Sequence, residues 1–357
     1  MGRQLMKLLV ILVLLPLAAL ADVINIKESA PQVYVVKKGD TLWDISSLYL
    51  DKPWQWPELW RNNVHITNPH LIYPGDELRL RYNEKGEPVL DVVREEPKKQ
   101  IKLSPQGVKQ AKSALPIPAL PWTVIQPYIE NSQIMSEEEY GRLPRMLGNQ
   151  DGSVRFASGD IVLTKSMRRT PEHYNVIRKQ DEIRDQYDNL LGIQIRHVAD
   201  ATPLKSDVEG QHLVEVQQAN FEVKRGDKLL PKTEPELDSL ILSAATRQRG
   251  QIVSSLEQHR LLGKYDVVVL DLGQREVKPG TVMGIYVQGP TIFDSDDPKY
   301  ENENNFVQSA FDGADEVQQP AIKVGEVVIF KVFDKASYGL ITRSTKVVRI
   351  GALVAKP

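Results

Sequence analysis

The chain has 357 residues, 41% of them hydrophobic and 26% charged, which is ordinary for a folded protein and argues against a disordered chain. Its 45 Lys and Arg residues nearly balance its 47 Asp and Glu residues, and no basic run stands out, so we expect no nucleic-acid partner. The absence of cysteine excludes disulfides, thiolate metal sites and cysteine nucleophiles.

The first 21 residues have the pattern of a signal peptide. Arg3 and Lys7 precede an apolar run over residues 8–15, and small residues lead to Ala21 just before the first acid. The apolar segment is shorter than the ~20 residues that cross a bilayer. We therefore expect cleavage after Ala21, a periplasmic location and no transmembrane anchor in the mature chain. An uncleaved N-terminal anchor is the alternative.

Residues 31–82 predict a compact unit with the order strand, helix, helix, strand. After an alternating strand, residues 41–44 (Thr-Leu-Trp-Asp) form a capping box that opens a helix. Pro57 suits the first position of a second helix. A Pro-Gly-Asp turn at residues 74–76 then leads into a short strand at residues 78–80.

The strings VYVVKKGDTLWDIS, WPELWRNN and ITNPHLIYPGDELRL within this unit resemble the LysM domain, a small glycan-binding module of cell-wall proteins. The resemblance includes both ends of the module, and the WPELW insertion is similar to a longer bacterial form. It implies a βααβ fold with a shallow glycan groove between two loops. The residues that it implies for the groove are Gly39, Asp40, Thr41 and Leu42 in one loop and Asn68, Pro69, Leu71, Ile72 and Tyr73 in the other.

Such a groove offers backbone hydrogen bonds to N-acetyl groups and an apolar floor beneath the sugar, so charged side chains are not needed. Residues 31–82 hold six basic and six acidic residues, which suits a neutral N-acetylglucosamine polymer. We expect most of the clustered tryptophans to be core residues, although an exposed ring would extend the sugar platform. Trp54, beside prolines, is the best candidate for exposure. The cluster comprises Trp43, Trp54, Trp56 and Trp60.

Residues 83–120 predict a semi-extended linker. Prolines interleaved with lysines prevent helix propagation and remove strand donors. A structured connector packed on the next domain is the alternative for the apolar end, residues 115–122. The prolines are Pro88, Pro97, Pro105, Pro116 and Pro118.

Residues 121–357 contain many short β-branched or alternating runs and predict small barrels or sandwiches, so the fold class is α+β. We expect one β-rich region or two subdomains, 121–232 and 263–357, joined by a helix within residues 234–248. Four glycines are predicted to take positive φ at strand-entry turns: Gly159, Gly226, Gly280 and Gly325. The predicted strands are residues 161–163, 213–216, 267–270, 282–287, 327–332 and 345–350.

The runs GDIVLT, FEVKRGDKLLP and VGEVVIFKVFDKASYGLITRSTKVVRIGALV in this half are similar to a group of proteobacterial periplasmic proteins. These proteins join an N-terminal LysM domain to a β-rich half. The resemblance implies an architecture and no established activity.

Motifs of wall-cutting enzymes are absent from the sequence. No H-x-H, H-E-x-x-H or G-x-S-x-G pattern occurs, and the one Glu-Ser pair, at Glu28, precedes the LysM-like unit. Acidic residues after Asp294 lack the loop glycine and spacing of calcium sites, so a solvated acidic loop is the favoured interpretation. We therefore predict neither a metal nor a cofactor.

The sequence thus predicts a non-catalytic envelope protein that binds peptidoglycan glycan strands and contacts another envelope protein through its β-rich half. The alternative is a peptidoglycan-modifying enzyme with an active site in residues 121–357. A cleft there, lined by two acids with displaced pKa values, would favour that alternative.

Overall fold

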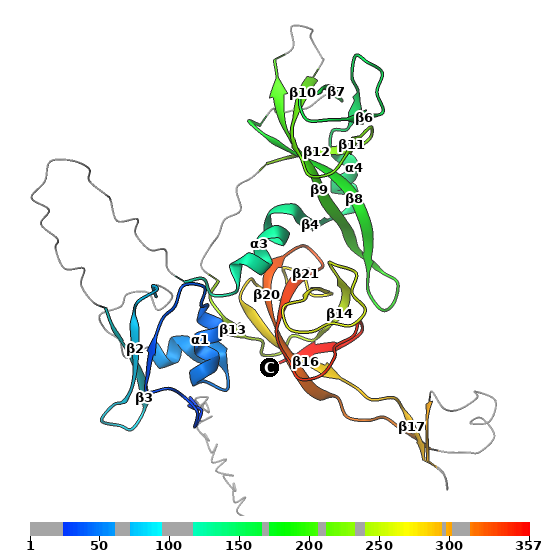
Figure 1. Ribbon diagram of the computed structural model, residues 1–357. Coiled ribbons are helices and arrows are strands. Elements are labelled where there is room, and N and C mark those ends of the chain that lie inside the picture. The colour runs from blue at the N-terminus through cyan, green and yellow to red at the C-terminus, as the bar shows by residue number, and fades with distance from the viewer. Residues whose placement is uncertain are drawn as a thin grey trace, which may run out of the picture.

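The computed structural model describes residues 24–60, 72–94, 117–165, 171–205, 212–232, 240–294, 298–301 and 315–357 (Figure 1). Three units follow one another along the chain: an N-terminal unit (residues 24–94), a middle unit (residues 122–232) and a barrel with a projecting arm (residues 240–357). The mainly β character of the region after the N-terminal unit is as predicted. The predicted signal peptide lies outside the described residues.

The N-terminal unit has the predicted order strand, helix, helix, strand and adds one more strand. Its helix α1 begins as expected, because the Thr41 hydroxyl accepts the backbone N–H of Asp44 at 3.0 Å. Gly39 and Gly75 take the positive φ values, 100° and 99°, that the two predicted turns require. The elements are β1 (Val33–Val35), α1 (Leu42–Tyr49), η1 (Pro53–Gln55), α2 (Trp56–Trp60), β2 (Glu77–Tyr82) and β3 (Pro88–Val93), in an antiparallel sheet of order β1-β2-β3.

The prediction of a linker over residues 83–120 is wrong at both ends. β3 pairs with β2 along its whole length, and Pro88 is tolerated because it is the first residue of an edge strand. Residues 117–120 pack against folded structure, with Ile117 in the core of the N-terminal unit. The alternative prediction, a structured connector, is therefore correct for residues 117–120. This connector packs on the preceding unit as well as on the following one. Residues 95–116 lie outside the described residues.

The middle unit is a twisted antiparallel sheet of order β12-β8-β9-β10-β7-β5, with β4 also paired to β9 and a separate β6–β11 pair. Its long hairpin, β8 with β9, runs down beside the barrel (Figure 1). There the Gln258 side-chain amide donates to Asp181 at 2.9 Å. The elements are α3 (Trp122–Asn131), β4 (Ser132–Met135), α4 (Glu137–Arg142), β5 (Met146–Gly148), β6 (Arg155–Phe156), β7 (Ile161–Thr164), β8 (Tyr174–Arg184), β9 (Leu190–Leu204), β10 (His212–Ala219), β11 (Val223–Lys224) and β12 (Lys228–Pro231).

The C-terminal unit is a closed barrel, because the sheet order β16-β20-β21-β15-β14-β22 returns to β16 through a β16–β22 pairing. Closure leaves few strand edges, and β13 covers part of β16 as a short parallel strand. Apolar side chains such as Ile252, Val268 and Ile329 fill the interior. The elements are β13 (Ser243–Ala244), β14 (Gly250–Ser255), β15 (Val267–Leu270), β16 (Thr281–Val287), β20 (Ile322–Val332), β21 (Ser337–Ser344) and β22 (Leu353–Ala355).

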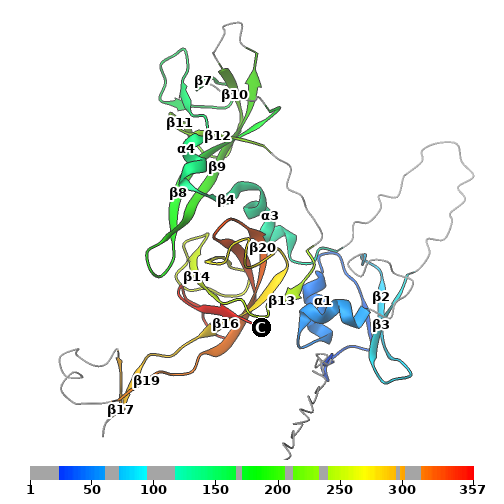
Figure 2. The same ribbon diagram turned by 180° about the vertical axis from the view of Figure 1, so that it is seen from behind.

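A small arm projects from the barrel, as Figures 1 and 2 both show. It contains β17 (Ile292–Asp294), β18 (Lys299–Tyr300) and β19 (Asp315–Val317) in the order β18-β17-β19. Of the acidic residues considered for calcium, Asp296, Asp297 and Glu303 lie outside the described residues.

Two predicted elements of the C-terminal half are wrong. Residues 240–248 are not helical. The backbone N–H groups of Ser243 and Ala245 instead donate to the carbonyls of Gly280, just before β16, and Val282, within β16. The rest of that predicted helix, residues 234–239, lies outside the described residues. Residues 345–350 form no strand and contribute a single bridge to the sheet structure, between Val348 and Leu262.

The predicted positive φ is confirmed at Gly159, Gly226 and Gly280 but not at Gly325. Gly325 lies beside an irregularity in the pairing of β20 with β16, and an added Cβ there would lie 2.4 Å from the carbonyl oxygen of Arg343. Glycine is needed there for the close approach of two strands and not for its backbone conformation.

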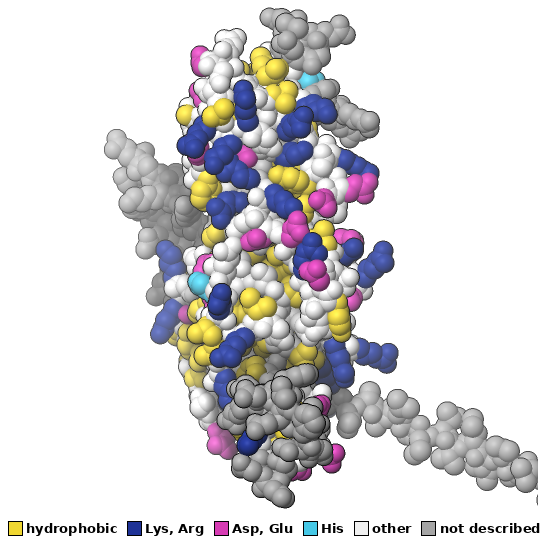
Figure 3. All heavy atoms as spheres, turned by 90° about the vertical axis from the view of Figure 1, so that its right-hand side faces the viewer, with side chains coloured by type: hydrophobic (Ala, Val, Ile, Leu, Met, Phe, Trp, Pro, Cys, Tyr) yellow, Lys and Arg dark blue, Asp and Glu magenta, His cyan; other side chains and the backbone are white. Residues whose placement is uncertain are grey.

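Lys and Arg side chains gather over the upper half of the face in Figure 3, on the middle unit, although the sequence has no basic run. Within the same unit, Arg178 pairs with Asp227 at 2.7 Å, and Lys179 pairs with Glu182 at 2.7 Å. Folding therefore gathers basic side chains on one face of a chain that has no basic run in its sequence.

Candidate functional site

The structure brings the two predicted loops of the N-terminal unit together and places their residues at different depths. Gly39 is exposed, whereas Asp40 and Tyr73 are half-buried. Thr41, Leu42 and Ile72 are buried, with exposed fractions of 2%, 2% and 0%. Asn68, Pro69 and Leu71 lie outside the described residues.

Each loop is held by an aspartate that follows a glycine. In the first loop the Asp40 carboxylate accepts the backbone N–H of Lys37 at 2.8 Å and the hydroxyl of Tyr34 at 2.9 Å. Burial, together with the hydrogen bond to Asp40, raises the pKa of Tyr34 to about 12. These contacts fix the conformation of the turn that precedes α1.

The second loop is held in the same way by Asp76, which also binds the guanidinium of Arg94. The buried Asp76 carboxylate accepts the backbone N–H of Tyr73 at 3.0 Å and two hydrogen bonds from Arg94, at 2.9 and 2.7 Å. The Arg94 guanidinium also lies over the Tyr73 ring, 4.7 Å from its centroid. Its hydrogen bonds to Asp76 raise the pKa of Arg94.

Residues 117–120, which we call the cover segment, lie between these two loops. The carbonyls of Pro118 and Ala119 accept the backbone N–H groups of Leu42 and Trp43, at 2.9 and 3.1 Å. On the other side, the N–H of Ile117 donates to the carbonyl of Ile72 at 2.7 Å. Main-chain groups of both loops are therefore bonded to the chain itself in this structure.

The prediction that Trp54 is exposed is wrong: its exposed fraction is 7%, and Trp43 and Trp56 are buried as well. Trp56 belongs to the core of the N-terminal unit. Trp43 and Trp54 instead share a cluster with barrel residues such as Val328. They fasten the N-terminal unit to the barrel, and so they do not provide a sugar platform.

Charged contacts support the same interface. The Lys323 ammonium lies 5.6 Å from the centroid of the Trp54 ring, and Lys264 lies 3.9 Å from Asp44. The side chain of Trp60 is outside the part of the chain that the structure describes.

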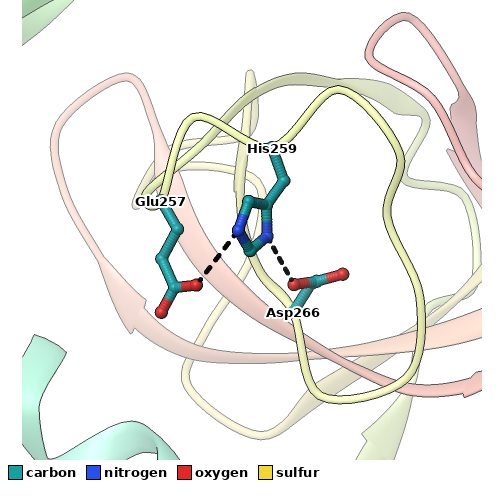
Figure 4. Close-up of side chains that lie close together, drawn as sticks. All are labelled: Glu257, His259 and Asp266. Carbon is teal, nitrogen blue, oxygen red and sulfur yellow. Dashed lines mark hydrogen bonds and ion pairs between the residues drawn. The ribbon is translucent and has the colours of Figure 1, made fainter.

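A second cluster, which sequence spacing did not reveal, consists of Glu257, His259 and Asp266 beside the barrel (Figure 4). His259 Nδ1 lies 3.1 Å from Asp266, and His259 Nε2 lies 3.5 Å from Glu257. Their donor atoms lie within 4.8 Å of one another, as a metal site would need. However, the imidazole stands between the two carboxylates, so hydrogen bonding and ion pairing account for the arrangement without an ion.

Glu257 also borders an open cleft of about 600 Å³ between α3, β9 and the loop after β14. Tyr128 of α3 donates its hydroxyl to Glu257 across this cleft. Gln194, Arg196 and Phe221 of the middle unit also line this cleft. Glu257 is the single carboxylate among the residues that line this cleft, so it lacks the pair of acids that would favour the enzyme alternative.

Comparison with known proteins identifies the first of these sites. Residues 34–81 match the family model of the LysM domain. Part of the chain is 36% identical to the uncharacterized protein YqbP of Bacillus subtilis (strain 168), over 15% of this chain and 29% of that protein. The chain therefore spans less than a third of the length of this relative.

Residues 34–81 of the N-terminal unit are thus a small βααβ module, and in particular a LysM domain. LysM domains bind glycans that contain N-acetylglucosamine, such as peptidoglycan, and are not catalytic themselves. Among the described residues, no helix combines the length and the apolar character needed to span a bilayer.

Proposed function

We propose that this protein is a non-catalytic peptidoglycan-binding protein of the cell envelope. Its LysM domain docks on N-acetylglucosamine-containing strands, and its β-rich half binds another envelope protein. We further propose that it is exported to the periplasm and cleaved after Ala21. The observation that carries the proposal is the LysM match at residues 34–81, together with the two facing loops whose turns are fixed by Asp40 and Asp76.

The main-chain groups of these loops suit the acetamido group of N-acetylglucosamine. Leu42 and Trp43 point N–H groups out of the first turn of α1, where a helix has donors without helical partners. Ile72 supplies a carbonyl acceptor from the opposite loop. An acetamido group carries one acceptor and one donor, so it matches this pairing without any charged side chain.

The arm of the barrel supports the second half of the proposal. Tyr300, Val317 and Ile322 on or beside it have exposed fractions of 44%, 44% and 58%. Apolar side chains gathered on a projecting element are typical of surfaces that bind other proteins. A pull-down from cell envelopes with the intact chain, and with Val317 and Ile322 both replaced by serine, tests this part.

Binding to sacculi tests the glycan half. We expect the full chain to sediment with purified sacculi and to be released by N-acetylglucosamine oligomers. If the Tyr73 ring contacts the sugar, Tyr73→Ala should weaken binding about tenfold, which corresponds to a loss of about 1.4 kcal/mol in binding free energy. Tyr82→Ala is the matched control, because Tyr82 lies in the same domain and is 60% exposed away from the loops. Equal binding by both variants would remove Tyr73 from the site.

The enzyme alternative is tested by incubating the full chain with sacculi and separating any released muropeptides by chromatography. The proposal predicts no new products. New products from the unmodified chain that are absent with the Glu257→Gln variant would contradict the proposal and would indicate an active site in the cleft beside the barrel.

A further inference from the structure

The cover segment uses the same main-chain groups that we assign to glycan binding. Its carbonyls at Pro118 and Ala119 take the two free donors of α1, and its N–H at Ile117 takes the Ile72 carbonyl. A peptide bond and an acetamido group are both amides, with one acceptor and one donor each. The segment therefore forms hydrogen bonds with the main-chain groups of the groove through amide groups, the same kind of group that an N-acetylglucosamine unit would offer.

Side chains at both ends hold the segment in place. Ile117 is 5% exposed and belongs to the core of the LysM domain. Leu120 is 1% exposed and belongs to the cluster shared with α3 and the barrel. Pro118 and Pro121 restrict the conformations of the free segment, which lowers the entropy lost when it docks.

We infer that residues 117–120 are an autoinhibitory cover, and that glycan enters the groove only when this segment leaves it. The inference rests on the proposed function, since it assumes that the groove between residues 39–42 and 72–73 binds glycan. A glycan and the cover segment cannot both bond to Leu42, Trp43 and Ile72 at once.

The cover is continuous with an element that is anchored on the barrel. It leads directly into α3, and the Lys331 ammonium on β20 donates to the carbonyls of Ile129 and Ser132 at the end of that helix, both at 2.7 Å. Ile125 of α3 packs in the cluster shared with the barrel. The C-terminal end of the cover is therefore tethered through α3 to the barrel, so the cover must separate from the loops at its Ile117 end first.

The size of the effect follows from the population of the open state. A minor conformer is populated at about 0.1–10%. Because the apparent dissociation constant is the intrinsic one divided by the open fraction, the cover should weaken glycan binding about 10- to 1000-fold.

The test compares glycan affinity of full-length variants by calorimetry with a soluble N-acetylglucosamine oligomer. Ile117→Ala loosens the cover and leaves every groove residue in place, so affinity should rise at least about tenfold. Leu80→Ala is the matched control, because Leu80 is a buried residue of the same core on β2 and is not part of the cover. It should lower stability without raising affinity.

Amide hydrogen exchange provides a second measurement that does not depend on a substitution. Saturating oligomer should remove the protection of the Ile117 amide in the unmodified chain, while the amides of Leu42 and Trp43 stay protected by the glycan. If oligomer binds but Ile117 stays protected, or if folded Ile117→Ala binds no more tightly than the unmodified chain, the cover is refuted and the glycan site stands. If no form binds the oligomer, the proposed function fails and the cover fails with it.

Discussion

The half-buried Lys331 gives a prediction whose size can be worked out from its surroundings. Its ammonium caps the end of α3 through the carbonyls of Ile129 and Ser132, and it lies 5.7 Å from the centroid of the Phe333 ring. Burial lowers the pKa of Lys331 from 10.5 to about 8, because the charged form loses its hydration. At about 1.4 kcal/mol per pKa unit, this fall corresponds to about 3 kcal/mol.

The sign of the pH effect follows from proton binding in the two states. Below pH 8 Lys331 is charged in both the folded and the unfolded chain, so the burial cost is fully present. Between pH 8 and 10.5 the unfolded chain holds the proton and the folded chain releases it, so the free energy of unfolding should rise with pH.

The Lys331→Met variant lacks the ammonium and therefore this pH-dependent contribution to stability. Urea unfolding from pH 7 to 10.5 measures the difference in free energy of unfolding between the two chains. The stability of the unmodified chain relative to Lys331→Met should increase by about 3 kcal/mol over that range. Tyrosine ionisation is common to both chains and cancels in the difference. Lys335→Met, at an exposed position, controls for the loss of a positive charge. A flat difference across the range would refute the argument that burial governs Lys331.

Two further substitutions test the contacts that hold the LysM domain. Trp54→Ala should lower the free energy of unfolding by about 3–5 kcal/mol, because it empties part of the core shared with the barrel, whereas Tyr187→Ala, at 77% exposure, should change it little; denaturant unfolding measures both. Asp76→Asn should cost about 1–3 kcal/mol in the same assay, because the charge-assisted bonds from Arg94 are lost, and Asp91→Asn, whose partner is exposed, should cost about 0–1 kcal/mol. Equal costs within either pair would contradict these assignments.

The features that could be predicted from sequence depend on neighbouring residues. Thr41 caps α1 through Asp44, three residues away, and the turns at Gly39 and Gly75 need only a residue that tolerates positive φ. These determinants lie within a few positions of one another, so a pattern in the sequence reports them directly.

The features that could not be predicted depend on distant partners. Residues 240–245 have helical spacing of apolar side chains, but the exposed edge of β16 offers their backbone a better set of hydrogen bonds. β3 is likewise a strand because β2 offers an edge to it, despite Pro88. Tertiary pairing thus overrides local preference at both places.

The same limit applies to the candidate site. The groove loops were predicted from their motif, but their cover was not, because its bonds to Leu42, Trp43 and Ile72 are made by main-chain groups that leave no side-chain pattern. Trp54 was predicted to be exposed because it lies among prolines, and only the docked barrel buries it. Ile72 was likewise predicted from the motif to line the groove, but its side chain is 0% exposed and belongs to the core of the N-terminal unit.

The most direct test of the central claim is an NMR titration of the isotope-labelled full chain with a soluble N-acetylglucosamine oligomer. Glycan binding by the LysM domain predicts saturable shift changes at the amides of Gly39, Leu42, Trp43 and Tyr73, accompanied by changes at Ile117 as the cover leaves. Changes confined to the middle unit or the barrel, or no change at millimolar oligomer, would contradict it.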